Sequence, residues 1–138
     1  MNRNAKTIAS VVAGIVVASA GIGLGTAQQA AAPKPQPVMK QDLESVPGRD
    51  GLVSFVEFPP GSAEVPHTHP AELFVFVREN EVVLETEGKP DTTYKVGDVF
   101  YIGSGKVHRV MNNTAATSRT VAFFVAEKGK PLTTPLAK

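Results

Sequence analysis

Three histidines are the residues of this chain best suited to chemistry, and they are all the histidines it has. His67 and His69 stand two positions apart, directly before Pro70 and a run rich in Val and Phe. On an extended backbone, residues i and i+2 project from the same face, with Cα atoms roughly 7 Å apart. Both imidazoles can then reach one ion at about 2.1 Å from each ring nitrogen. With His108 as a third ring, this spacing predicts a metal site.

Each histidine also has an interpretation without metal. His67 and His69 could be polar residues of a surface loop, and His108 taken alone could be a hydrogen-bonded strand residue. A metal-bound histidine needs an acceptor for its other ring nitrogen. Glu64, Asn112 or a backbone carbonyl could take that role, and the sequence does not choose among them.

The N-terminal segment does not belong to the folded domain. Arg3 and Lys6 precede an apolar run of small residues over 8–24, and Gly-Thr-Ala follows at 25–27. This order is typical of a secretory signal peptide spanning residues 1–27. The alternative is an uncleaved membrane anchor, because the run is near the length that spans a bilayer. We therefore expect an exported protein, periplasmic or secreted, with membrane contact only through this segment.

The next segment, residues 28–40, is rich in Ala, Pro, Lys and Gln, with prolines at positions 33, 35 and 37. That composition predicts a disordered, solvated linker. The folded part is then residues 41–138, which is enough for a single core.

Composition excludes several classes of protein. There is no cysteine, so neither a disulfide nor a lipidated cysteine is available. The formal net charge of +1 falls to −1 when the two basic residues of segment 1–27 are removed. A near-neutral domain without basic clusters argues against nucleic acid as a partner. There is also no nucleophile elbow and no phosphate-binding glycine loop.

The elements that must position the histidines are expected to be strands. Short apolar runs with period-2 alternation dominate, and turn signals such as Pro59-Pro60-Gly61 and Glu79-Asn80 recur every eight to twelve residues. This pattern predicts an all-β antiparallel sandwich or barrel. The predicted strands are 52–58, 73–77, 81–87, 92–96, 98–102, 107–111 and 120–126.

The histidines fall within two short motifs, in order along the chain. The first is a glycine, five residues, His-x-His and a glutamate a few residues later, over 61–72. The second is a glycine, five residues, a Pro-x-Gly turn, two residues, a histidine and an asparagine, over 97–112, with Gly103 in place of the proline. Together the motifs resemble those of the cupin superfamily, in particular its small single-domain bacterial members.

The resemblance implies an antiparallel jelly-roll β-barrel that binds a divalent transition metal, with Fe, Zn, Mn, Ni and Cu as candidates. His67, His69 and His108 would be ligands. It also implies a small-molecule ligand or substrate and a homodimer, because cupins commonly pair through their sheets.

Glu72 departs from the motif. The usual carboxylate position corresponds to Leu73, and a shift of one residue on a strand turns a side chain to the other face. Glu72 could be a fourth ligand or a general base only if an irregular strand entry turned it inward. The other interpretation is a solvent-facing strand residue.

Two functions follow from the resemblance. The first is a metal-dependent enzyme acting on a small organic molecule, with oxidation, decarboxylation, isomerisation and lyase chemistry all open. The second is a non-catalytic cupin that binds or senses a ligand, which the leucine at the carboxylate position favours because a general base is then harder to name.

Overall fold

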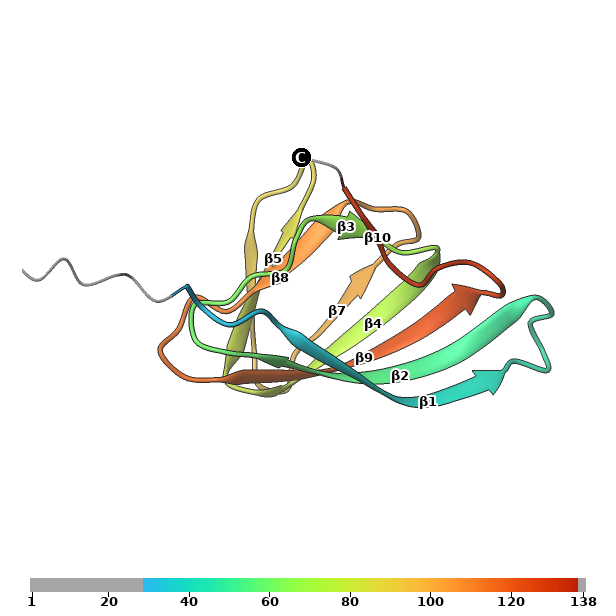
Figure 1. Ribbon diagram of the computed structural model, residues 1–138, viewed down its shortest axis with the longest axis horizontal. Coiled ribbons are helices and arrows are strands. Elements are labelled where there is room, and N and C mark those ends of the chain that lie inside the picture. Colours follow the sequence, from blue (N-terminus) through green and yellow to red (C-terminus); the bar gives the residue numbers. More distant parts are fainter. Residues whose placement is uncertain (1–28, 137–138) are drawn as a thin grey trace, which may run out of the picture.

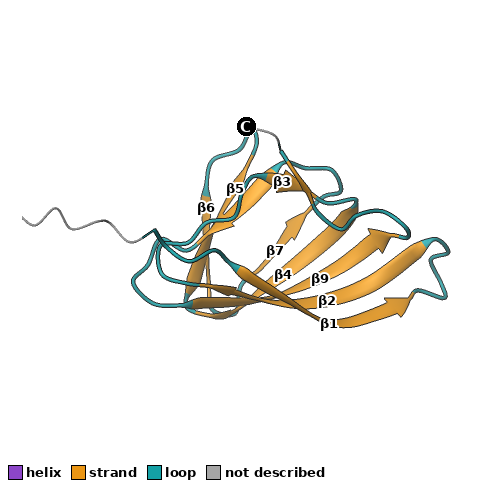
Figure 2. Cartoon of the chain, viewed as in Figure 1, coloured by secondary structure: helices purple, strands orange, loops and turns teal. Residues whose placement is uncertain are grey.

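A computed structural model describes residues 29–136 as strands joined by loops, with no helix in that part of the chain (Figures 1 and 2). The predicted signal peptide lies outside the described residues. No helix among the described residues has the length and apolar character needed to cross a membrane. The strands are β1 (Lys34–Asp42), β2 (Arg49–Phe58), β3 (His67–Thr68), β4 (Ala71–Glu79), β5 (Glu81–Thr86), β6 (Thr92–Lys95), β7 (Val99–Ile102), β8 (His108–Met111), β9 (Ser118–Glu127) and β10 (Thr134–Pro135).

The described strands form two antiparallel sheets of five strands each. Sheet A has the order β1-β2-β9-β4-β7, and sheet B has the order β10-β3-β8-β5-β6. Both sheets draw on strands far apart in the sequence, and Figure 1 shows β3, β5 and β8 on one side of sheet A. This is the all-β architecture that the turn-punctuated sequence predicts.

The core lies between the two sheets, because alternate residues of each strand point inward. On β4, Leu73, Val75 and Val77 are buried while the residues between them are exposed. Phe124 on β9 and Val82 on β5 bury their side chains in the same core. Strands with one apolar and one solvated face are the expected product of this alternation.

The predicted strands are confirmed, with small shifts at their ends. The run 120–126 is extended to Ser118–Glu127, and 52–58 is extended to Arg49–Phe58. The predicted turn between β4 and β5 holds Asn80 at a φ of 58°. This left-handed conformation is one that asparagine adopts more readily than most residues do.

The structure corrects the predicted linker, because residues 34–40 belong to strand β1, which pairs with β2 along its length. Proline cannot donate to a strand ladder, so it is confined to sheet edges. In an antiparallel pair, residues two apart direct their N–H groups to the same side. Pro35 and Pro37, which lack an N–H group, therefore fall at positions that point to the free edge. The backbone N–H groups of Lys34 and Gln36 point toward β2.

Asn112, at the end of the second motif, ties together the loops at one end of the barrel. Its side chain is fully buried. Its Nδ2 group donates to the carbonyl oxygens of Phe58 (2.9 Å), Pro59 (3.2 Å) and Ala116 (2.7 Å). Its Oδ1 accepts hydrogen bonds from the backbone N–H and the hydroxyl of Thr114. The asparagine of the motif therefore has a structural role.

Candidate metal centre

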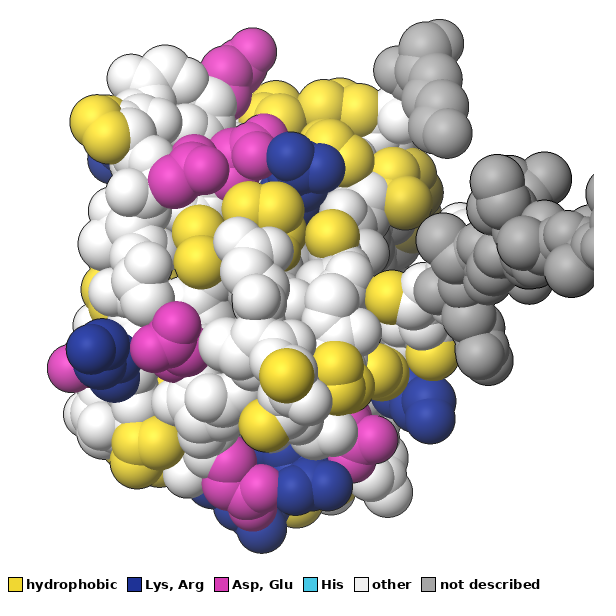
Figure 3. Space-filling model, turned by 90° about the vertical axis from the view of Figure 1, so that its left-hand side faces the viewer, with side chains coloured by type: hydrophobic (Ala, Val, Ile, Leu, Met, Phe, Trp, Pro, Cys, Tyr) yellow, Lys and Arg dark blue, Asp and Glu magenta, His cyan; other side chains and the backbone are white. Residues whose placement is uncertain are grey.

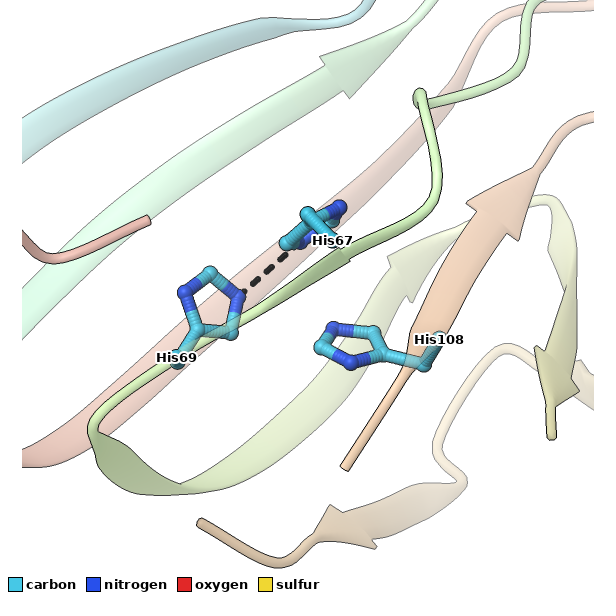
Figure 4. Close-up of side chains that lie close together, drawn as sticks. All are labelled: His67, His69 and His108. Carbon is cyan, nitrogen blue, oxygen red and sulfur yellow. Dashed lines mark hydrogen bonds between the residues drawn. The ribbon is translucent and has the colours of Figure 1, made fainter. Parts of the chain in front are cut away.

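The structure brings the three histidines together. His67 lies on β3, His69 follows that strand, and His108 begins β8 directly opposite His67 in the ladder. The ring centroids are 4.5 to 5.1 Å apart, and one ligand nitrogen from each ring lies within 4.8 Å of the others (Figure 4). All three residues are buried. On the face shown in Figure 3, acidic and basic side chains lie among apolar ones and no histidine is visible.

Backbone carbonyls fix the orientation of every ring. Each ring donates its Nδ1 hydrogen to a carbonyl oxygen, in the pairs His67–Val65 (2.7 Å), His69–Leu132 (2.7 Å) and His108–Lys106 (2.9 Å). Because a carbonyl can only accept, the neutral rings must carry hydrogen on Nδ1 and an unshared electron pair on Nε2. Of the three acceptors that the sequence left open, the backbone carbonyl is therefore the one used.

The Nε2 atoms of His67 and His69 face each other at 3.0 Å (Figure 4). With both Nδ1 atoms protonated, neither neutral ring has a hydrogen to place between them, so two electron pairs are in contact. Two metal–nitrogen bonds of about 2.1 Å at a right angle span about 3.0 Å, so one cation fits this pair. The donor set thus fits a metal ion on its own geometry.

Burial keeps the rings in the form that binds metal. Desolvation lowers the pKa of His69 to about 4, although its hydrogen bond to Leu132 acts in the opposite direction. Desolvation also lowers the pKa of His108, against the hydrogen bond to Lys106. Both rings are therefore neutral at physiological pH, as metal ligation requires.

Glu72 is not brought to this group. It lies on β4 with its side chain exposed on the outer face of sheet A, opposite Val125 of β9. Leu73, its neighbour, points inward and is 3% exposed. The strand begins at Ala71 without a bulge between Ala71 and Leu73, so the period-2 alternation decides the outcome. Of the two interpretations of Glu72, the structure supports the solvent-facing strand residue, and the alternative of an inward ligand or general base is wrong.

A cavity of about 610 Å³ lies between the sheets and reaches the three histidines. Among the described residues its lining contains no lysine or arginine, and Glu64 is its one acid. Apolar side chains form most of its walls, among them Leu52, Val56, Leu73, Val75, Ile102 and Phe124. Cavities of this size hold small organic molecules.

The sequence did not predict the roles of two groups at the site. The carbonyl of Leu132 holds His69 from 63 positions away, and any residue type could supply it. Glu64 projects its carboxyl group beside the cavity, where Oε2 accepts a hydrogen bond from the N–H of Val110 at 2.9 Å. Burial raises the pKa of Glu64, against the effect of nearby His67. The sequence indicated Glu64 only as an acceptor for a histidine ring.

Known proteins share this fold. A germin-like protein (subfamily 2 member 2) of Arabidopsis thaliana is 33% identical over 91 residues, which are 60% of this chain and 42% of that protein. The chain thus spans about two fifths of the length of this relative. A structure of an uncharacterised double-stranded β-helix protein from Klebsiella pneumoniae superposes with a TM-score of 0.63 at 19% identity, covering 78% of this chain and 86% of that one.

An oxalate oxidase in complex with the substrate analogue glycolate gives a TM-score of 0.60 at 20% identity, covering 75% of this chain and 55% of that one. At such identities the structural likeness shows the fold alone. The Cupin domain family (Cupin_2) matches residues 54–125, which include both motifs and all three histidines. This chain therefore belongs to the cupin family.

Proposed function

We propose that this protein binds a divalent transition metal through Nε2 of His67, His69 and His108 and acts as an enzyme on a small organic molecule. The observation that carries the proposal is the convergence of nitrogen electron pairs, two of them 3.0 Å apart, in rings fixed by carbonyls. Neutral imidazole suits Zn, Cu, Fe and Ni, and the lack of a carboxylate in this group favours those ions over Mn. When bound, such an ion polarises a substrate oxygen or lowers the pKa of a water molecule.

The cavity supports a substrate with a largely apolar body. Its walls are aliphatic and aromatic, and no cationic side chain among the described lining residues would pair with a substrate carboxylate. Leu73 and Phe124 would exclude water from the face of the substrate that lies on sheet A. Glu64 is placed to exchange a hydrogen bond with a polar group of the substrate, since among the described residues only its Oε2 atom has a hydrogen-bond partner. The cavity thus favours a substrate less polar than glycolate.

A non-catalytic binding cupin is the second candidate. The outward position of Glu72 favours it, because the acid that most nearly fits the sequence motif cannot serve as a base at the rings. We also propose export, which the signal-like segment 1–27 supports.

Metal content and turnover test these proposals. The wild-type protein, His108→Ala and the control Glu72→Gln would be purified in parallel and their transition metals quantified. We expect about one metal ion per chain in the wild type and in Glu72→Gln, and loss of metal in His108→Ala. Equal metal in all three proteins would refute the site.

Catalysis is then tested with the metal-loaded protein and a panel of diphenols, β-diketones and keto acids. Consumption of an apolar member by the wild type, but not by His108→Ala, would support the enzyme. Binding of a panel member without consumption would favour the second candidate.

A further inference from the structure

The cavity opens on one side of the barrel, between the edge strands of the two sheets. Sheet A ends at β7 on one side and at β1 on the other, and sheet B ends at β6 and β10. Strands β6 and β7 are joined by the turn at 96–98, which connects the sheets on their side. Among the described strands no ladder joins β1 to β10, and Figure 1 shows these two strands lying apart.

The residues that line the cavity change from buried to exposed toward this opening. Leu73, Val75 and Val110, on inner strands, are 3% to 5% exposed. The lining residues that border the opening are half-buried or exposed instead. We define the mouth of the cavity as these residues, which are Pro33, Pro35, Pro37, Val65, Thr133 and Pro135.

Strand β1 presents its prolines to the cavity and its polar side chains to the other face of the sheet. Pro35 and Pro37 line the cavity, as do the residues of β2 that pair with them. Lys34 and Gln36 alternate with these prolines and line a separate hollow. The period of two therefore places only apolar rings of β1 at the mouth.

A further proline borders the mouth from sheet B. Pro135 pairs with His67 in the ladder between β10 and β3. Side chains of directly paired residues lie on the same face of a sheet. Pro135 therefore lies beside His67 on the cavity side, and a molecule bound at the histidines lies next to the mouth.

The chemistry of the mouth favours an apolar, uncharged ligand group. Proline loses no side-chain freedom on burial, so packing against its ring costs little conformational entropy. Because proline has no N–H, the prolines of β1 offer no hydrogen-bond donor to an anionic group. The same property hinders a further strand from pairing with the free edge of β1. A small molecule is therefore a better occupant than an extended peptide.

The size of the cavity indicates that one ligand extends from the histidines to the mouth. Its volume of about 610 Å³ lies within the roughly 300–1,000 Å³ of sites that enclose drug-sized molecules. Five of the six mouth residues also lie outside residues 54–125, the part of the chain that matches the Cupin domain family. The mouth is thus built mainly by segments particular to this chain.

We propose that the mouth is a specificity-determining site, which binds the apolar end of a neutral ring compound whose oxygen-bearing end lies at the three histidines. Strand β1 then selects the substrate, although it holds no metal ligand. This proposal rests on the proposed binding of a small organic molecule in the cavity. It adds that the substrate has an uncharged apolar part, such as a fused aromatic ring, that reaches the prolines.

Dye binding tests the proposal with the purified protein. The neutral naphthalene ketone prodan and the sulfonated naphthalene dye ANS would be titrated into the wild type, Pro35→Asp and the matched control Gln36→Asp. Position 36 lies on the same exposed strand but faces away from the cavity. We expect prodan to bind the wild type and the control equally, and Pro35→Asp at least about tenfold more weakly, because a hydrated carboxylate replaces an apolar contact.

The anionic dye tests the expected neutrality of the ligand. ANS should bind the wild type at least about tenfold more weakly than prodan, because its sulfonate meets no cation or proline N–H at the mouth. Equal prodan affinity in the three proteins, no prodan binding by the wild type, or equal affinity for the two dyes would overturn the proposal.

Thiol protection locates the bound dye independently of these affinities. The chain has no cysteine, so Pro35→Cys and Gln36→Cys each introduce a single thiol for iodoacetamide. At about ten times its Kd, prodan should slow the reaction of Pro35→Cys about tenfold, because about nine tenths of the sites are then occupied. It should leave Gln36→Cys unchanged. Equal protection of both thiols, or of neither, would overturn the proposal.

Metal content separates this proposal from the proposed metal site. We expect the wild type, Pro35→Asp and Gln36→Asp to carry equal amounts of metal. If none of them carries metal while prodan still distinguishes position 35 from position 36, the metal site is refuted and the mouth is supported. If all carry metal but prodan does not distinguish the two positions, the mouth is refuted and the metal site stands.

Discussion

The buried neutral histidines should make the metal-free protein sensitive to mild acid. Burial holds the pKa of His69 at about 4, against the ordinary histidine value of 6.5 that applies in the unfolded chain. Between these two values the unfolded chain binds more protons, so the free energy of unfolding falls as the pH is lowered. The contribution of neutral His69 to the free energy of unfolding is fully present above the pKa of the unfolded chain. It falls by about 2 kcal/mol between pH 7 and pH 5.

Other groups add to this change or oppose it. The lowered pKa of His108 acts in the same direction. Glu64 acts in the opposite direction, because burial raises its pKa and the folded chain then takes up its proton first. Asp42 and Glu127, whose pKa values are lowered chiefly by hydrogen bonds to lysines, titrate mostly below this range. Between pH 7 and pH 5, the free energy of unfolding should therefore fall more in Glu64→Gln than in the wild type.

The assay is urea unfolding of chelator-treated protein at pH 7, 6 and 5, at one protein concentration and ionic strength. His69→Gln is the matched control, since an amide can still donate to the carbonyl of Leu132 but does not titrate. We expect the control to lose about 2 kcal/mol less than the wild type over this range. A wild-type free energy of unfolding that is equal or higher at pH 5 would refute buried, neutral rings.

Two substitutions test other parts of the structure. Asn112→Ala removes the donor for the carbonyls of Phe58, Pro59 and Ala116, and should lower the free energy of unfolding by about 3 kcal/mol in urea titrations. A loss below about 1 kcal/mol would contradict the network. Leu73→Glu places a carboxylate in the cavity shared with the histidines. Without metal it should destabilise the fold by several kcal/mol, and added metal should raise its melting temperature more than that of the wild type. Equal metal-induced shifts would show that position 73 does not reach the ion.

The strands were predictable because burial on one face imposes a period of two. The sequence of β4 alternates apolar inward residues with outward ones, and this alternation alone placed Glu72 and Leu73 on opposite faces. The convergence of His67 and His69 with His108 was likewise predictable, although only motif spacing linked the third ring to the other two. Local pattern was sufficient wherever a strand has one buried face.

Local pattern failed where the stabilising contacts are distant or lie in the main chain. Strand β1 is exposed along its whole length, so it has no apolar alternation to detect, and its prolines favour a linker. Its pairing depends on β2 offering a free edge, which only the tertiary fold provides. The carbonyl of Leu132 that orients His69 is equally invisible, because every residue carries one.

The hydrogen bond between His69 and Leu132 implies that the histidine group is completed late in folding. Strand β10, just beyond Leu132, pairs with β3 beside His67, so the chain must close a contact between residues 63 positions apart before the ring of His69 is held. Contacts between residues distant in sequence form late in folding, because the entropy cost of closing the loop comes before the contact stabilises the chain. Metal binding would then follow the completion of folding. A chain cleaved between Lys130 and Leu132 would keep sheet A but lose the carbonyl that orients His69 for a metal ion.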